Sequence, residues 1–255
     1  MMQVRHLCKS FGGNVAVHDV SFTVHAGEML ALIGPNGAGK STCFNMLTGQ
    51  LATDSGTVIL RDKNITGLKP HRIAALGLAC TFQIAATFTS MTVLENIQIA
   101  MAAHQRRIFS FWSPLSAQYR EPAMALLQQL EMAHLAEQSC AFLAYGDIKR
   151  LELGIALASE PAVLLMDEPT AGMATAERRS LMRLVKTLVQ QRDMAVLFTE
   201  HSMDVVFECA DRVMVMARGT KLTEGTVAQV RENPLVQQVY FGSGAVLSGQ
   251  QAGVL

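Results

Sequence analysis

The sequence predicts an α/β fold in which a largely parallel sheet carries helices on both faces, with an inserted helical subdomain. Three observations lead to this class. Short apolar segments alternate with helical ones along most of the 255 residues. The apolar segment Met29–Ile33 runs straight into a glycine-rich loop that is followed by a helix. Between about Val93 and Leu143 the spacing is helical with little strand character, so the sheet pattern is interrupted there.

Alternation, apolar runs and glycine stops mark the elements before this insertion. The second strand alternates until a turn at Ala26–Gly27, Gly49 ends the helix after the loop, and Gly77 ends a short helix that begins at Pro70. In chain order we expect strands at Val4–Leu7, Val15–Val24, Met29–Ile33, Gly56–Leu60 and Leu78–Phe82, the last one buried, and helices at Gly39–Thr48 and Pro70–Leu76.

The alternation resumes after the insertion, which we place at about residues 88–160. We expect a strand at Val163–Met166, a helix at Ala176–Gln190, and strands at Ala195–Thr199 and Arg212–Met216. Residues 243–255 are rich in small side chains and are predicted to form a flexible tail, so the folded domain is expected to span residues 1–242.

Composition excludes several classes of protein. Lys plus Arg equals Asp plus Glu, 21 of each, so no overall basic field attracts nucleic acid. Apolar stretches such as Ala162–Met166 are too short to span a bilayer, and the N-terminus lacks a secretory signal. The sequence therefore predicts a soluble cytoplasmic protein. Its cysteines are odd in number and scattered, which favours reduced thiols: Cys8, Cys43, Cys80, Cys140 and Cys209.

The loop GPNGAGKST at 34–42 has the pattern that cradles phosphates. Its glycines permit backbone angles that turn successive N–H groups into one anion-binding concavity. We expect Lys40 to reach the terminal phosphates, Ser41 to bind a magnesium ion, and Thr42 to open a helix whose positive end favours phosphate. The predicted nucleotide-binding residues are Gly34, Pro35, Asn36, Gly37, Ala38, Gly39, Lys40, Ser41 and Thr42.

Two adjacent acids follow the apolar run Val163–Met166, which is typical of a strand buried on both faces. Adjacent carboxylates at such a strand end are costly unless they are paired or bind a cation. We expect Asp167 to hold the magnesium shell and Glu168 to orient or deprotonate an attacking water. The alternative, a solvated acid pair at a surface turn, is disfavoured by the buried strand before it.

Other strands end in polar groups in the same way. Phe82 is followed by Gln83, Thr199 by Glu200 and His201, and Ile33 by the phosphate loop. Because ligands of open α/β sheets bind beyond the carboxyl ends of the strands, these ends predict one convergent site.

The order of these motifs resembles the ATPase subunits of ABC transporters over about Val4 to Gly242: the phosphate loop, Gln83, LAYGD at 143–147, LLMDEP at 164–169, and His201. The resemblance implies a P-loop fold of mixed, mainly parallel sheet with an antiparallel β subdomain, and binding of ATP and Mg²⁺. It implies that His201 contacts the terminal phosphate and that Gln83 binds the magnesium ion and signals to the membrane subunit. Phe11 matches the aromatic that stacks on adenine, although a core phenylalanine is an alternative.

By the same resemblance, the LAYGD segment is a signature motif that contacts a nucleotide held by a second subunit. Gly146 is expected to open a helix whose apolar positions Ile148, Leu151, Ile155 and Ala158 share one face. Each subunit then carries two half-sites. The implied signature residues are Ala144, Tyr145, Gly146 and Asp147. Ala144 departs from the serine that most signatures carry, and Asp147 from the commoner glutamine.

Within that family the chain resembles the ATPases of branched-chain amino acid importers, through FGGNVAVHDVSF at 11–22, Tyr145 with RLEL, TAGM at 170–173 and NPLVQQVYFG at 233–242. Importers of urea or short amides and lipid exporters are related alternatives. The implied partners are a second ATPase subunit, identical or different, the transmembrane permease subunits and, indirectly, an extracytoplasmic substrate-binding protein. The implied location is peripheral, at the cytoplasmic face of the inner membrane.

Two rival classes have less support. A DNA-associated ATPase of related design would need a coiled coil, a zinc module or a second ATPase domain, and the patch of Arg106, Arg107, Phe109, Phe111 and Trp112 has too few arginines to track phosphates. We therefore expect no nucleic-acid partner. The LAYGD segment and His201 disfavour a stand-alone P-loop kinase.

Overall fold

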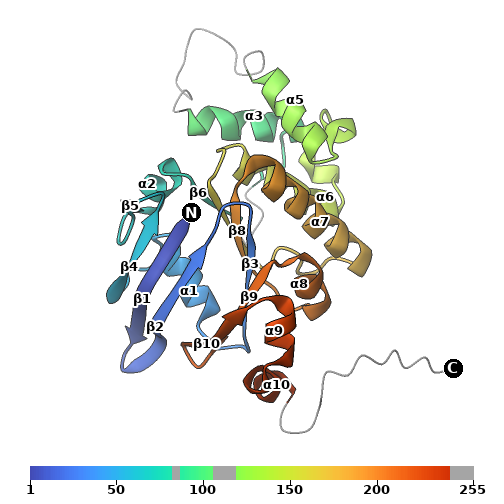
Figure 1. Cartoon of the computed structure of the whole chain (residues 1–255). Helices are drawn as coiled ribbons and strands as arrows, with labels where there is room; N and C mark the ends of the chain where they lie inside the picture. Colours follow the sequence, from blue (N-terminus) through green and yellow to red (C-terminus); the bar gives the residue numbers. More distant parts are fainter. Residues whose placement is uncertain (82–86, 106–118, 242–255) are drawn as a thin grey trace, which may run out of the picture.

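The computed structural model describes residues 1–81, 87–105 and 119–241 (Figure 1). The strands are β1 (Met2–Phe11), β2 (Asn14–Val24), β3 (Met29–Ile33), β4 (Ser55–Leu60), β5 (Lys63–Asn64), β6 (Leu78–Thr81), β7 (Val163–Asp167), β8 (Ala195–Thr199), β9 (Arg212–Ala217) and β10 (Thr220–Gly225). The helices are α1 (Lys40–Leu47), α2 (Pro70–Ala75), α3 (Val93–His104), α5 (Arg120–Gln129), α6 (Tyr145–Leu157), α7 (Thr175–Arg192), α8 (Met203–Cys209), α9 (Val227–Glu232) and α10 (Pro234–Phe241), with 3-10 turns at Ala133–Leu135 and Cys140–Phe142.

The larger sheet has the strand order β10-β9-β3-β8-β7-β6. Each pair from β9 to β6 is parallel, and β10 joins β9 in the antiparallel sense. The predicted mixed, mainly parallel sheet is therefore confirmed. Because β3, β8, β7 and β6 are neighbours, their carboxyl ends lie along one continuous edge, which is where the sequence places its polar groups.

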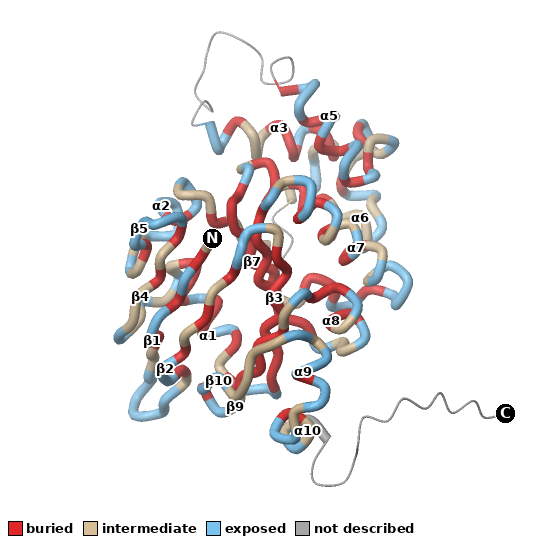
Figure 2. Tube along the Cα trace, in the orientation of Figure 1, coloured by how far each residue is buried: buried red, intermediate tan, exposed pale blue. Residues whose placement is uncertain are grey.

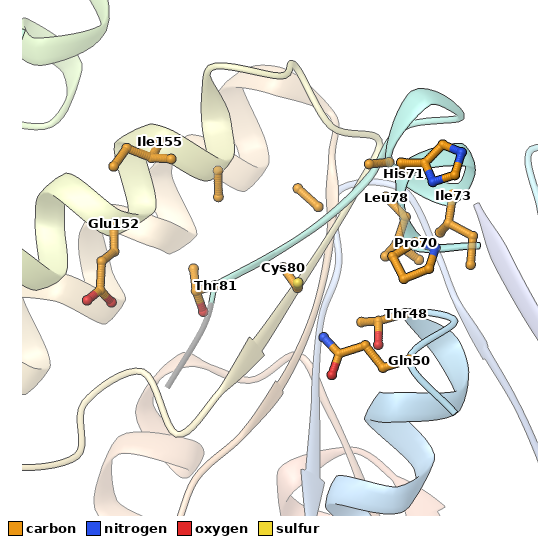
Figure 3. A pocket seen from close by; sticks show the side chains of 13 residues that line it. Thr48, Gln50, Pro70, His71, Ile73, Leu78, Cys80, Thr81, Glu152 and Ile155 are labelled. Carbon is orange, nitrogen blue, oxygen red and sulfur yellow. The ribbon is translucent and has the colours of Figure 1, made fainter. Parts of the chain in front are cut away.

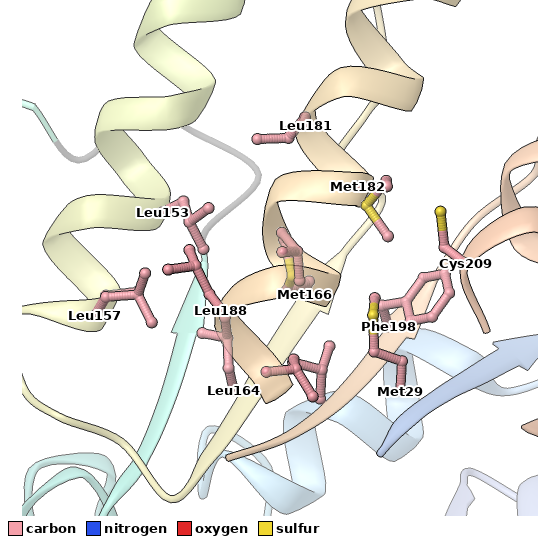
Figure 4. Packing of buried hydrophobic residues seen from close by; sticks show 14 of the residues in the cluster. Met29, Leu153, Leu157, Leu164, Met166, Leu181, Met182, Leu188, Phe198 and Cys209 are labelled. Atoms are coloured by element: carbon pink, nitrogen blue, oxygen red, sulfur yellow. The ribbon is translucent and has the colours of Figure 1, made fainter. Parts of the chain in front are cut away.

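The central strands β3, β7, β8 and β9 are buried on both faces of this sheet (Figure 2). Successive side chains of a strand point to opposite sides, so each strand contributes to two clusters. Along β3, Met29, Ala31 and Ile33 belong to one hydrophobic cluster, whereas Leu30 and Leu32 belong to another. Figure 4 shows the first cluster, where side chains of α6 and α7 such as Leu153 and Leu188 pack over the sheet. The second cluster contains α1 and the smaller sheet.

The smaller sheet is antiparallel, with the order β2-β1-β4-β5, as the resemblance implies. It contributes buried side chains of β1 and β2 to the second cluster, among them Val4, Leu7, Val20 and Phe22. Its β2 strand also reaches the glycine loop after β3, since a Cβ on Gly39 would lie 2.4 Å from the Ala16 carbonyl oxygen.

The helices α3, α5 and α6 lie between β6 and β7 in the chain and gather at one end of the molecule (Figure 1). A capping box starts α3, since the Glu95 N–H donates to Thr92 Oγ1 and the Thr92 N–H donates to the Glu95 carboxylate. Gly154 lets α6 approach Ile97 of α3 and Leu130 closely, because a Cβ there would lie 2.6 Å from Leu130 Cδ1 and 2.8 Å from Ile97 Cδ1. We keep 88–160 as the proposed bounds of this helical subdomain, whereas the tail expected at 243–255 lies outside the described residues.

One expectation about burial was wrong. The strand β6 is an edge strand, so only Leu78 is buried and the rest are half-exposed. On α6, Leu151 and Ala158 of the predicted apolar face are buried and Ile148 and Ile155 are half-buried, and Lys149, Glu152 and Leu153 are buried as well. The reason is that α6 packs on α3 as well as over the sheet, so its buried surface is wider than one stripe.

The cysteines are free thiols, as expected, and burial raises the pKa of Cys43, at the start of α1, to about 12. Within the described part of the chain, no helix has both the length and the apolar character needed to cross a membrane.

Candidate nucleotide site

The phosphate loop joins β3 to α1 and is held by close backbone contacts. Gly37 and Gly39 have φ angles of 77° and 97°, which favour glycine. A Cβ on Gly34 would lie 2.3 Å from the Met216 carbonyl oxygen, and one on Gly39 would lie 2.4 Å from that of Ala16. The loop therefore rests against β9 and β2, and only glycine permits that approach. Pro35, Asn36 and Gly37 are exposed, whereas Ala38 is buried.

Lys40 is buried at the first position of α1, and its Nζ donates to the carbonyl oxygens of Gly34 at 2.7 Å and Pro35 at 3.2 Å. Burial lowers its pKa, while the negative charges of Glu168 and Asp167 act in the opposite direction. An anion in the loop would compete with these carbonyls for the ammonium group. The first N–H groups of α1 have no partner within the helix, and they add positive potential at the same place. Ser41 is exposed and Thr42 half-buried there.

Asp167 is the last residue of β7, and Glu168 follows it in a left-handed backbone conformation with φ of 50°. The two are ordered by Thr199, the last residue of β8. Its hydroxyl donates to Asp167 Oδ1 at 2.5 Å, and the Glu168 N–H donates to Thr199 Oγ1 at 3.0 Å. A left-handed glutamate costs roughly 1–3 kcal/mol, so these bonds hold a conformation that the chain would not adopt freely.

His201 and Glu168 form a pair across the ends of β8 and β7. The distance from His201 Nε2 to Glu168 Oε1 is 2.8 Å. Both side chains keep contact with solvent, with exposed fractions of 51% and 29%. The pair is therefore accessible to a water molecule or a phosphate group.

The buried Glu200 carboxylate holds the two segments that carry Glu168 and His201. Glu200 accepts hydrogen bonds from the Thr170 N–H at 3.0 Å, the Thr170 hydroxyl at 2.5 Å and the His201 N–H at 3.2 Å. It thereby ties the loop after Glu168 to the segment that carries His201. Thr170, Thr199 and Glu200 were not among the predicted site residues, although Thr199 and Glu200 stand at the end of β8, which is a signal.

Phe11 ends β1 and has 49% of its surface exposed, so the alternative of a core phenylalanine was wrong. The Lys9 ammonium lies 5.6 Å from its ring centroid. The ring stands in the hairpin that leads into β2, the strand whose Ala16 carbonyl contacts Gly39. An exposed aromatic on the hairpin before this strand suits stacking on a base, and its adenine role stays a prediction.

The signature segment starts α6, with Ala144 as the N-cap and Tyr145 as the first helical residue, one position before the expected Gly146. Ala144 has no side-chain oxygen with which to cap the helix. The Tyr145 hydroxyl donates to the Ala171 carbonyl at 3.0 Å, which fixes this end of α6 to the loop after the acids. Gly146 and Asp147 are half-buried.

The site thus has two separate parts. Lys40, Asp167, Glu168 and His201 surround the phosphate loop, whereas no hydrogen bond or ion pair among the described residues joins Ala144–Asp147 to that loop. Gln83 and the patch of Arg106, Arg107, Phe109, Phe111 and Trp112 lie outside the described residues.

A magnesium ion fits the donor set of the first part. Mg²⁺ is bound by one or two protein oxygens together with substrate phosphates and waters. The Asp167 carboxylate and the Ser41 hydroxyl are such oxygens. Within residues 1–81, 87–105 and 119–241, no group of three or more His, Cys, Asp or Glu side chains has the arrangement of an all-protein metal site. These residues therefore suit a metal ion that arrives with a nucleotide.

Comparisons with known proteins agree with this geometry. Residues 17–171 match the protein family described as ABC transporter. The chain is 36% identical over 251 residues to the high-affinity branched-chain amino acid transport ATP-binding protein LivG of Escherichia coli (strain K12), with 95% of this chain and 98% of that protein covered. It is 35% identical over 249 residues to BraF of Pseudomonas aeruginosa, which has the same description, with 95% and 98% covered.

Among solved structures, the ADP conformation of MJ1267, an ATP-binding cassette of an ABC transporter, superposes with a TM-score of 0.85 at 32% identity. The superposition covers 95% of this chain and 98% of that one. The expected P-loop cassette fold is therefore confirmed.

Proposed function

This chain belongs to the ABC transporter family, and we propose that it is the ATP-hydrolysing subunit of an importer of branched-chain or other hydrophobic amino acids. The observation that carries the hydrolytic role is the His201–Glu168 pair, 2.8 Å apart, at the strand ends beside Lys40 and Asp167. The amino acid substrates are taken from the names of the relatives LivG and BraF, with which the chain aligns over nearly its whole length.

In the proposed reaction, Lys40 and the N–H groups of the phosphate loop bind the β- and γ-phosphates of ATP. Glu168 orients a water and accepts its proton while the water oxygen bonds to the γ-phosphorus. The bond from that phosphorus to the β,γ-bridging oxygen breaks, which gives ADP and phosphate. His201 donates to a γ-phosphate oxygen. Its ring is oriented by Glu168, and its backbone N–H is held by the hydrogen bond to Glu200. Asp167 and Ser41 would hold Mg²⁺, which neutralises phosphate charge when bound, and Gln83 is proposed to join that shell.

The signature segment is proposed to act on a nucleotide held by a second ATPase subunit, identical or different. Two features support this arrangement. Ala144 and Tyr145 are exposed at the start of α6, and no hydrogen bond or ion pair among the described residues joins this helix end to the chain's own phosphate loop. Backbone N–H groups at a helix start stabilise an anion, so the segment can serve a phosphate that another subunit brings to it.

We further propose that the chain binds peripherally to transmembrane permease subunits at the cytoplasmic face of the inner membrane, with an extracytoplasmic protein delivering the substrate. Signalling between ATP and the permease is proposed to pass through Gln83 and the helical subdomain. The test is uptake by the complete complex in proteoliposomes, with ATP inside. We expect ATP-dependent uptake of leucine, isoleucine or valine. Uptake of urea or a short amide alone would identify a related importer, and salt-sensitive binding to DNA without a permease would overturn the proposal.

Replacing Ala144 by serine is expected to increase the rate of ATP turnover by the assembled complex. The serine hydroxyl adds one donor toward a charged phosphate, and such hydrogen bonds contribute on the order of 1.5–3 kcal/mol. If this hydrogen bond forms only in the transition state, the turnover rate is expected to rise by about tenfold or more. Serine also caps α6, which is expected to stabilise the isolated chain by about 1 kcal/mol. Phosphate release and thermal unfolding measure the two effects separately.

The matched control is Ala141→Ser, an equally small change at an exposed position three residues upstream. It is expected to alter neither quantity. Unchanged turnover in Ala144→Ser, together with a raised melting temperature, would mean that the backbone N–H groups alone make the contact with the phosphate.

A further inference from the structure

A pocket of about 370 Å³ lies outside the nucleotide site, where the helices α3, α5, α6 and α7 come together. Its apolar wall contains Met101 of α3, Leu126 of α5 and Leu157 of α6. Polar side chains complete the lining: His104, Gln105, Tyr119, Gln129, Glu160 and Arg192. Because sites for small molecules range from roughly 300 to 1,000 Å³, this pocket has room for one small ligand.

Two opposite charges border this pocket without forming an ion pair. Arg192 ends α7, and Glu160 follows α6 in a left-handed backbone conformation with φ of 49°. No ion pair joins them in the part of the chain that the structure describes, and the Arg192 guanidinium donates instead to the neutral Gln129 Oε1. Burial lowers the pKa of Arg192, while the negative charge of Glu160 acts in the opposite direction. The carboxylate therefore lies close enough to act on the guanidinium, yet each group can still bind a charged partner.

This pair of charges favours a zwitterion. A guanidinium carries five N–H donors in a planar arrangement that matches the two oxygens of a carboxylate, and a carboxylate accepts well from an ammonium group. A ligand with an acid but no amine would be repelled by Glu160, and one with an amine but no acid would be repelled by Arg192. The apolar wall selects a ligand whose remaining part is a hydrocarbon.

Another pocket of similar size, about 340 Å³, does not have this combination of charges (Figure 3). It lies between α2, β6 and α6, and its walls include Ile73, Leu78 and Ile155. No arginine or lysine is found among the described residues that line it, so the carboxylate of a ligand would meet no permanent cation there. It therefore serves as a comparison site of nearly equal volume.

We propose that the pocket between α3, α5, α6 and α7 binds one free α-amino acid with a branched apolar side chain. Arg192 donates to its carboxylate, and Glu160 accepts from its ammonium group. Its side chain packs on Met101, Leu126 and Leu157. The choice of side chain rests on the importer function proposed above, since such an amino acid is the molecule that the importer releases into the cytoplasm. The pocket then senses the product of transport.

Binding at this pocket would join two parts of the chain. The helices α3 and α5 belong to the proposed helical subdomain, whereas α7 packs over the main sheet (Figure 4). The same α7 starts at Thr175, shortly after Glu168, and ends at Arg192, so one helix connects the proposed general base with the pocket. A ligand held between these elements restrains their relative movement. We therefore expect the bound amino acid to slow ATP turnover.

The first test is calorimetric titration of the full-length wild-type chain with L-leucine and three analogues. Leucinamide lacks the carboxylate, the corresponding 2-oxo acid lacks the ammonium group, and glycine lacks the apolar side chain. Loss of one charge-assisted hydrogen bond predicts that leucinamide and the 2-oxo acid each bind about tenfold to a hundredfold more weakly than leucine. Loss of the buried side chain predicts that glycine binds at least about tenfold more weakly.

A variant of the arginine gives the second test. Arg192→Met removes the cation, and we expect it to weaken leucine binding by about tenfold to a hundredfold and to make leucine and leucinamide bind equally. The matched control is Arg183→Met on the same helix, because Arg183 is exposed, pairs with Glu208 and does not line the pocket. It is expected to bind leucine as the wild type does. Thermal unfolding verifies that each variant is folded, and the analogue series stands even where a variant is not.

Thiol labelling locates the bound amino acid. Cys80 borders the pocket of Figure 3, whereas Cys8, on β1, lines neither pocket, and both are half-buried. Leucine is expected to leave the ratio of their maleimide labelling rates unchanged. Slower labelling of Cys80 alone would place the ligand in the other pocket and overturn the inference.

In the assembled complex, saturating leucine is expected to slow ATP turnover by about fivefold or more in the wild type, and to have no such effect in Arg192→Met. Equal binding of leucine and its 2-oxo acid, or wild-type affinity in Arg192→Met, would contradict the proposed site. Unchanged turnover with leucine bound would contradict the restraint on α7. If leucine does not bind while the complex imports it, the proposed function stands and this inference alone fails. If leucine binds but the complex imports no branched-chain amino acid, the importer proposal fails and the pocket remains a binding site.

Discussion

Replacing Glu168 by glutamine is expected to reduce ATP turnover by at least about a hundredfold while leaving ATP binding intact. General-base catalysis contributes roughly 10²–10⁴-fold, and an amide cannot accept the proton of the attacking water. The amide keeps the size of the side chain and retains an oxygen that can face His201 Nε2, which lies 2.8 Å from Glu168 Oε1 in the wild type. ATP should therefore stay bound, and the closed pair of subunits should accumulate. Phosphate release measures the first effect, and size-exclusion chromatography with ATP measures the second.

The matched control is Glu160→Gln. Glu160 also has a left-handed backbone, with φ of 49° against 50° for Glu168, but it is exposed and lies outside the nucleotide site. Any cost of placing glutamine in that conformation is common to both variants. Turnover near the wild-type rate in Glu168→Gln would remove Glu168 from the role of general base.

Much of the nucleotide site follows from local sequence patterns. The phosphate loop, the acids after an apolar strand and the polar residues after β8 were all found as strand ends, and strand ends of a parallel sheet meet at one edge. The order β3-β8-β7-β6 makes those ends adjacent in space. The fold class was predictable for the same reason, because alternating apolar and helical periods extend over most of the chain.

The supporting hydrogen bonds were not predictable in this way. Thr199 forms hydrogen bonds with Glu168 and Asp167, which lie 31 and 32 residues earlier in the chain. Glu200 accepts a hydrogen bond from Thr170 across a similar separation. A threonine at the end of a strand gives no local signal of its partner. The pairing depends on β7 and β8 being neighbours, and a single sequence does not specify that order.

The C-terminal elements were missed for different reasons. The strand β10, Thr220–Gly225, is polar and has no buried residue, so it lacks the apolar alternation by which strands are recognised. By contrast, α9 does carry a signal, since Thr226 and Gln229 form a capping box directly before its buried Val230. The exposure of Phe11 required the structure, because an aromatic near a strand end fits a core position equally well by pattern.

The second large effect is expected at Gly39, where replacement by alanine should weaken ATP binding by at least about a hundredfold. The φ angle of 97° strains any other residue, and the added Cβ would lie 2.4 Å from the Ala16 carbonyl oxygen. Both atoms belong to backbone, so β2 and the loop must move apart. The N–H groups that follow Gly39 at the start of α1 then leave the concavity that holds phosphate. A factor of one hundred corresponds to about 2.7 kcal/mol, and titration with a fluorescent ATP analogue measures it.

Gly67→Ala separates this contact from the cost of a left-handed backbone alone. Gly67 has φ of 68°, and a Cβ there would meet no atom within 4 Å. Because it lies in the turn between β5 and α2, away from the phosphate loop, its replacement is expected to cost roughly 1–2 kcal/mol of stability with no change in ATP affinity. If Gly39→Ala lost no more stability than Gly67→Ala and still bound ATP as the wild type does, the contact with Ala16 would not be what shapes the loop. A loss of ATP affinity confined to Gly39→Ala would instead assign the shape of the cradle to the packing of β2 beneath it.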